Sequence, residues 1–339
     1  MASIRAPGRP SPSPAHKEIA PAPVIRGWAG AVVVFVALIA MLLITRGLAA
    51  TGQTTINGLV TGTYFALGAV GLSLVFGVLR LVNFAHGDML TFGAYVALLF
   101  NVNLGLSIVL AVVGGVIATA LLAALLEVIL WRPMRARGAG GLQLLLIAIG
   151  LAFVIRNGIQ LVAGADPLEL GVNVTSAIGL PSGWRIGTVE LVVVVVGVVV
   201  LLTVATFLRF SRIGKEMRAL SDNPNLAEVA GIDTRWVILI TWLVGGGLAG
   251  LAGALAGSVA GVLTPNFGFE LLLSLFAAAV LGGIGNAYGA LVGGLLLGLA
   301  EEWSTMFIDP SWKLAVGFAV LILTLLFRPS GILGRPGLK

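Results

Sequence analysis

Cysteine is absent from this chain of 339 residues, histidine occurs twice, and only 10% of the residues are charged. The absence of cysteine excludes disulfides, thiolate metal sites and cysteine nucleophiles. Two histidines are too few for most histidine-based metal sites, so we expect no metal site. Soluble domains carry about a quarter charged residues, so the low charge is typical of an integral membrane protein.

Apolar residues dominate what is present: 58% of the chain is hydrophobic and the mean hydropathy is +1.08. A helix that crosses a membrane needs roughly 20 mostly apolar residues, whereas a membrane β-barrel shows short alternating strands. Runs such as Leu191–Leu208 are long and continuous. The predicted fold class is therefore all-α, a polytopic helical bundle.

About eight transmembrane helices are predicted in the domain 28–330. They are expected at 28–46, 53–79, 84–100, 104–130, 142–163, 189–208, 236–262 and 311–327. Residues 1–27 are rich in proline, serine and arginine and lack the apolar core of a signal peptide, so we expect a disordered tail. Residues 331–339 are expected to form a second, short tail.

Basic residues cluster between the apolar runs. The clusters are Arg5, Arg9, Lys17 and Arg26; Arg132, Arg135 and Arg137; Arg209, Arg212, Lys215 and Arg218; and Arg328, Arg335 and Lys339. Short cytoplasmic loops are enriched in lysine and arginine, so all four clusters and both termini are predicted to be cytoplasmic. The net charge of +6 then reflects orientation in the lipid bilayer and implies no nucleic-acid partner.

The stretch 270–300 is apolar but is interrupted by LGGIGNAYG, Leu281–Gly289. The charge pattern requires this stretch to cross the membrane either twice or not at all. We therefore predict a re-entrant, broken helical hairpin that lines a pathway at Gly283, Gly285 and Asn286. One long kinked span is the alternative. The pattern also resembles a dinucleotide-binding fingerprint, but its last glycine is misplaced and no strand precedes it, so no cofactor is expected.

A polar loop, 209–235, separates two apolar runs. Asn223 followed by Pro224 predicts a helix start, and Gly231 predicts its end. The helix between them, 224–230, is only about two turns long and needs support from other contacts. It is either a capped linker on the bilayer surface or an element that docks a soluble partner.

Polar residues near the predicted spans are candidates for a pathway. Asn83, His86 and Asp88 fall at a predicted cytoplasmic turn, where Asp88 can cap a helix and His86 can face water, or where they line the pathway. Arg156 and Gln160 share a helix face inside a span and are the better pathway candidates. Glu127 is expected to reach a helix end near Arg132.

Two further glutamates, Glu301 and Glu302, are expected at the outer end of the hairpin, where a partner can engage them.

Three stretches together resemble one family. RALSDNPNLAEVAGIDTRWV, the run Asn57–Leu98 and the run Ala277–Glu302 are similar to permeases of ABC importers for branched-chain amino acids, over about residues 53–330. The resemblance implies that the polar loop carries the coupling helix, which seats in an ATPase subunit. The residues at this contact would be Asn223, Pro224, Asn225, Ala227, Glu228 and Gly231, a loose version of the fuller Glu-Ala-Ala-containing motif.

The resemblance further implies a permease in the bacterial inner membrane that works with a second permease, two ATPase subunits and an external binding protein. The chain has no phosphate-binding loop of its own, so it is not expected to be an enzyme. An ion-driven secondary carrier is the alternative, although few intramembrane carboxylates are available. A non-transporting scaffold is a third reading. The exact solute, and whether the two permeases are identical, stay open.

Overall fold

The computed structural model describes residues 24–172, 175–180 and 183–334. Most of the two expected tails, 1–23 and 335–339, therefore lies outside the described residues. The chain divides at Gly47 into two units, and the second unit, from Leu48 onward, contains nearly all of the fold.

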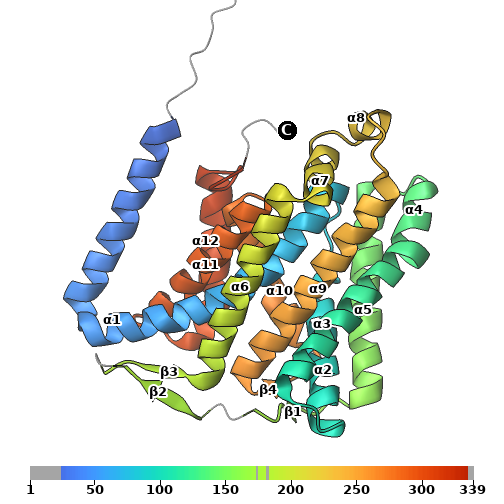
Figure 1. The fold of residues 1–339 in the computed structure, drawn as a ribbon. Helices are drawn as coiled ribbons and strands as arrows, with labels where there is room; N and C mark the ends of the chain where they lie inside the picture. Colours follow the sequence, from blue (N-terminus) through green and yellow to red (C-terminus); the bar gives the residue numbers. More distant parts are fainter. Residues whose placement is uncertain (1–23, 173–174, 181–182, 335–339) are drawn as a thin grey trace, which may run out of the picture. The chain divides into compact units, whose positions relative to one another are not determined.

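The described residues are mostly helical (Figure 1). The α-helices are α1 (Val24–Leu79), α2 (His86–Leu98), α3 (Ile108–Leu126), α4 (Arg132–Ala136), α5 (Gly141–Ala163), α6 (Thr188–Phe210), α7 (Arg212–Asp222), α8 (Pro224–Val229), α9 (Thr234–Ala260), α10 (Phe267–Gly282), α11 (Ala287–Ser304) and α12 (Lys313–Phe327). Two π-helical segments, η1 (Leu99–Asn103) and η2 (Glu127–Trp131), follow α2 and α3, and a 3-10 turn, η3 (Pro310–Trp312), precedes α12.

Six helical segments in the described part of the chain are long and apolar enough to cross a membrane. They are Ile39–Leu79, Ile108–Ala136, Gly141–Ala163, Thr188–Phe210, Thr234–Ala260 and Pro310–Phe327. The sequence predicts about eight, and the difference has two causes. The first two predicted spans fall on α1, where Gly47, with a non-helical φ of 78° and ψ of 166°, separates two helical arms. The arms are counted here as one segment, Ile39–Leu79, so whether they are two spans stays a prediction.

The second cause is the predicted span 84–100. Its α-helix, α2, has only 13 residues, or about 20 Å at 1.5 Å per residue, which is shorter than the ~30 Å hydrocarbon core. The segment before α2 is irregular, and Arg80 has a positive φ of 53°. The Nε2 of His86, at the start of α2, lies 3.0 Å from the carbonyl oxygen of Gly68, which belongs to the interior of α1. The chain thus turns back beside α1 before α2 begins.

Small residues allow α9 to pack closely on its neighbours. A Cβ added at Gly253 would lie 2.6 Å from the carbonyl carbon of Leu90 in α2, and one added at Gly250 would lie 2.8 Å from the Cβ of Thr119 in α3. Gly246 and Gly257 of the same helix also face other helices or strands. Close backbone approach of this kind is how helices associate in lipid.

The interrupted apolar stretch forms two helices, α10 and α11, joined by the turn Gly283–Asn286. They run antiparallel, because Gly289 packs on Gly282 near the turn and Ser274 donates a hydrogen bond to Glu301 at the other end. This arrangement corresponds to the predicted hairpin and not to one kinked span. Whether the hairpin is re-entrant stays a prediction.

The turn between α10 and α11 contacts the segment after α12: the backbone N–H of Leu333 donates a hydrogen bond to the carbonyl of Gly282, and the side-chain Nδ2 of Asn286 donates one to the carbonyl of Leu333. Gly285 packs against Gly77 at the end of α1. In Figure 1 the loops carrying α7 and α8, and α4, lie at this same end of the second unit.

The strands lie at the opposite end (Figure 1). Strand β1 (Leu168–Glu169) pairs antiparallel with β4 (Val262–Leu263), and β2 (Ala177–Gly179) pairs antiparallel with β3 (Arg185–Gly187). Within the described part of the second unit, the basic clusters that follow α3 and α6, and Arg328 after α12, therefore lie at the end without strands. This is the distribution that the positive-inside rule requires of cytoplasmic loops.

Candidate functional site

The short helix α8 forms as its local sequence predicts. The side chain of Asn223 accepts a hydrogen bond of 3.0 Å from the backbone N–H of Leu226, and Pro224 occupies the first helical position. Gly231, just beyond the helix, has a φ of +84°, a backbone conformation that favours glycine. These are local interactions, which is why the three residues Asn223, Pro224 and Gly231 were sufficient to predict them.

Among the described residues, α8 has one buried side chain, that of Ala227. Ala227 is 3% exposed and packs in the main hydrophobic cluster, whereas Leu226 is 65% exposed and Val229 is 87% exposed. Asn225 and Glu228 are exposed as well. The helix thus presents an apolar pair of side chains away from the chain at the end of the bundle that carries the basic loops.

A second group of predicted residues meets inside the bundle. Arg156 of α5 donates two hydrogen bonds to Asp88 of α2, from Nε to Oδ1 at 2.8 Å and from Nη2 to Oδ2 at 3.2 Å. The Asp88 side chain is fully buried and that of Arg156 is 13% exposed. The guanidinium also lies 4.2 Å from the ring centroid of Phe269 in α10, which fits a cation–π contact.

The two expectations that Asp88 caps a helix and that His86 faces water are wrong. Asp88 does not cap α2, because that helix begins at His86 and Asp88 lies within its first turn. His86 does not face water, since it is 1% exposed. Asn83 is fully buried; its Oδ1 accepts a hydrogen bond from the N–H of Ala85, and among the described residues its Nδ2 finds no partner.

The other predicted pathway residues lie elsewhere. Gln160 is exposed on α5. Gly283, Gly285 and Asn286 form the turn between α10 and α11, beside the segment after α12. The structure therefore joins Asp88 with Arg156 and places His86 in the same turn of α2, while the glycine turn belongs to the end of the bundle near α7.

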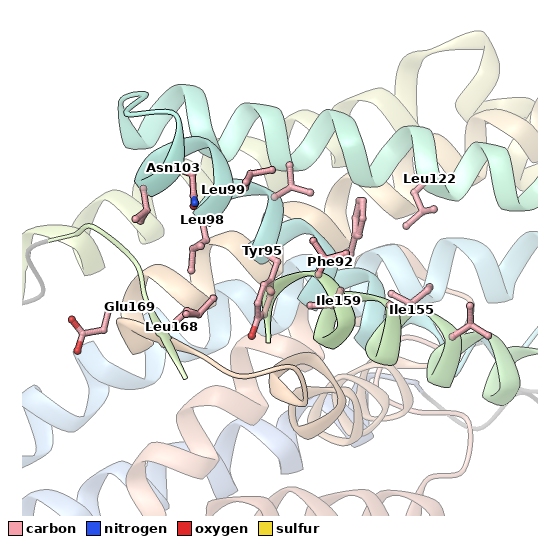
Figure 2. Close-up of a pocket in the computed structure, with 16 residues that line it drawn as sticks. Phe92, Tyr95, Leu98, Leu99, Asn103, Leu122, Ile155, Ile159, Leu168 and Glu169 are labelled. Atoms are coloured by element: carbon pink, nitrogen blue, oxygen red, sulfur yellow. The ribbon is translucent and has the colours of Figure 1, made fainter. Parts of the chain in front are cut away.

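A cavity of about 730 Å³ lies between α2, η1 and α5 (Figure 2). Its walls are mostly apolar, with Phe92 and Tyr95 from α2 and Ile155 and Ile159 from α5, and its few polar groups include Tyr95 and Glu169. Sequence reasoning missed these residues. Their hydrophobic spacing is indistinguishable from that of side chains packed in a core or facing lipid.

Two expectations about glutamates also change. Glu127 is buried and pairs with Arg135, one turn farther along than the expected Arg132. Glu301 and Glu302 are 4% and 7% exposed, so they are not offered to a partner on the surface. Glu302 instead bonds Lys313 at 2.6 Å and Thr61 at 3.0 Å, and Glu301 accepts from Ser274 at 2.9 Å.

The six long apolar helical segments of the described residues define a multi-pass membrane protein. The model of the family described as "Branched-chain amino acid transport system / permease component" matches residues 54–325. The chain belongs to this family. No solved structure matches it.

Named relatives agree with the family. The chain is 35% identical over 296 residues to the high-affinity branched-chain amino acid transport system permease protein LivH of Escherichia coli (strain K12), covering 84% of this chain and 96% of LivH. It is 34% identical, with the same coverage, to the corresponding protein BraD of Pseudomonas aeruginosa. A probable LivH of Methanocaldococcus jannaschii is 29% identical, covering 78% of this chain and 87% of that protein.

Proposed function

We propose that this protein is a permease subunit of an ABC importer for branched-chain or other hydrophobic amino acids, embedded in the bacterial inner membrane. It works with a second permease, two ATPase subunits and an external substrate-binding protein. The single observation that carries the proposal is the family match over residues 54–325, which includes every element of the second unit from within α1 to within α12. Ion-driven carriage has no such support.

The helix α8 is the contact with the ATPase. Leu226 and Val229 are exposed at the end of the bundle that carries the basic loops, where an aqueous surface would otherwise disfavour two large apolar side chains. A groove on a soluble ATPase subunit would cover the side chains of Leu226 and Val229 and remove them from water. Asn223, Pro224 and Gly231 hold the helix ends, and Ala227 fastens the helix to the bundle.

Transport follows by alternating access. Movement of α8, driven by ATP binding and hydrolysis in the partner, is passed to α7 and α9, the helices on either side of α8 in the chain. The caps at both ends of α8 and the buried Ala227 hold the helix against the bundle, so that its displacement can be passed on as a rigid-body movement of the neighbouring helices. The chain itself supplies the pathway and no ATP-binding site.

Reconstitution tests this function. Proteoliposomes that contain this permease, a second permease and ATPase subunits, supplied with an external binding protein, are expected to accumulate labelled leucine only with ATP inside. Omitting the ATPase should abolish uptake. Leucine uptake by the permease alone, driven by a proton or sodium gradient, would overturn the proposal.

A further inference from the structure

The ion pair of Asp88 and Arg156 and the cavity both lie along the contact between α2 and α5. Asp88, Phe92, Tyr95 and Leu99 are spaced four, three and four residues apart, so they follow one face of α2 and its continuation. The last three of these line the cavity. On α5, Arg156 directly follows Ile155 and precedes Ile159 by three residues, and both isoleucines line the cavity. Neither Asp88 nor Arg156 itself lines the cavity, but the spacing places the pair about one helical turn from Phe92 and Ile159, beyond one end of the apolar groove.

The ion pair of Asp88 and Arg156 places two charged side chains inside a bundle of membrane helices, where a function usually accounts for them. An ionised side chain within a membrane segment is expensive, and such residues face an interior or a pathway and pair with one another. Here the two charges sum to zero and are joined by two hydrogen bonds, and the guanidinium also contacts the ring of Phe269. Apolar residues of similar size would stabilise the packing at this place equally well, so stability alone does not explain the ion pair.

A free amino acid with an apolar side chain has the matching chemistry. Its carboxylate can accept hydrogen bonds from Arg156 and its ammonium can donate to Asp88, so a zwitterion exchanges partners with the pair and leaves no charge unmatched. The side chain then lies along the groove. The volume of about 730 Å³ is within the range of small-molecule sites.

We propose that this groove and its ion pair form the intramembrane binding site for the amino acid in transit, with the zwitterion at Asp88 and Arg156 and the side chain against Ile159 of α5. The inference rests on the proposed function and adds to it the place where the solute is held. Lipid acyl chains are the competing occupant of an apolar groove between membrane helices.

Ile159 gives the sharpest test because it is 8% exposed, lines the groove and carries no charge. In the complete reconstituted assembly, Ile159→Trp should lower the initial rate of labelled leucine uptake by about tenfold or more, while alanine uptake falls by less than about threefold. Each rate is divided by that of the unmodified permease, so the preference of the unchanged binding protein cancels.

Leu161→Trp is the matched control. Leu161 belongs to the same helix, is 87% exposed and does not line the groove, so both uptake rates should stay within about twofold. Should Ile159→Trp not assemble, Ile159→Ala decides the question, because the enlarged groove should raise phenylalanine uptake relative to leucine uptake by about threefold or more.

The outcomes separate the two proposals. If the unmodified assembly transports leucine but the Ile159 variants change the uptake of all solutes equally, or change none, the groove holds lipid or nothing and the inference is overturned. If the unmodified assembly transports no amino acid at all, the proposed function itself fails. A change of preference that follows side-chain size supports both.

Discussion

Asp88 and Arg156 lie 68 residues apart in the chain and are joined by two hydrogen bonds within the helical bundle. Each charge is compensated almost entirely by the other, because the carboxylate is fully buried and the guanidinium is 13% exposed. The pair links α2 to α5, while the ring of Phe269 extends the contact to α10.

Removing one partner should therefore be more harmful than removing both. Asp88→Asn or Arg156→Gln leaves an uncompensated buried charge, and each should lower the free energy of unfolding by about 3–5 kcal/mol. The double variant should lose at least ~1 kcal/mol less than the sum of the two single losses. Thermal unfolding of the purified protein in detergent measures this, with Asn157→Ala on the exposed side of α5 as the control. Strict additivity would show that the two side chains do not interact.

The exposed apolar pair on α8 leads to a prediction about coupling. Leu226→Glu combined with Val229→Glu places two charges in the proposed ATPase contact, so we expect loss of ATPase binding and at least about a tenfold loss of ATP-driven uptake. Because both side chains are exposed, the free energy of unfolding should change by no more than about 1 kcal/mol.

Arg212→Gln is the control for the α8 variant. Its side chain is 92% exposed on α7, and its ion pair in the described part of the chain is with Glu216 of the same helix, at 2.9 Å. Uptake by this variant should match that of the unmodified protein. Normal uptake by the α8 double variant would instead identify α8 as a passive surface linker.

The elements that could be predicted from the sequence are those set by neighbouring residues. The ends of α8 follow from Asn223, Pro224 and Gly231, and the turn after α10 follows from its glycines, because caps and turns are local. Long apolar runs likewise predict spans, since the thickness of the bilayer sets their length.

Contacts between distant residues could not be predicted in the same way. No local signal pairs Asp88 with Arg156, or directs Glu302 inward to Lys313, because such partners are chosen by the packing of whole helices. Hydropathy alone also overestimates the length of the helix α2. An apolar run does not reveal that its first residues turn back beside α1. The groove between α2 and α5 is invisible for a related reason: Phe92 and Ile159 look like any other core residues.

The close approach of α9 and α2 predicts different tolerances for two glycines of α9. A Cβ at Gly253 would lie 2.6 Å from the carbonyl carbon of Leu90, so Gly253→Ala forces the two backbones apart and should be destabilising by about 1–3 kcal/mol. At Gly247 the nearest atom would be the Cβ of Ala120 at 3.7 Å, an ordinary contact. Gly247→Ala should be neutral or stabilising, because alanine is the better helix former by about 1 kcal/mol. Comparable melting temperatures in detergent for the two variants would contradict this packing.

Glu301 and Glu302 are neighbours in the chain, yet they should respond differently to the same substitution. Glu302 bonds the ammonium of Lys313 at 2.6 Å, so Glu302→Gln leaves that charge without its carboxylate, whereas the amide oxygen of a glutamine at 301 can still accept the hydrogen bond from Ser274. We expect a loss of about 1–3 kcal/mol for Glu302→Gln, reduced from the value for a fully buried pair because the Lys313 side chain is 34% exposed. Glu301→Gln should change the free energy of unfolding by less than about 1 kcal/mol.

Adding Lys313→Met to Glu302→Gln should recover part of the loss, since the unmatched ammonium is then gone. Thermal unfolding of the three variants in the same detergent decides the matter, and a greater loss for Glu301→Gln than for Glu302→Gln would mean that Lys313 serves Glu301 instead.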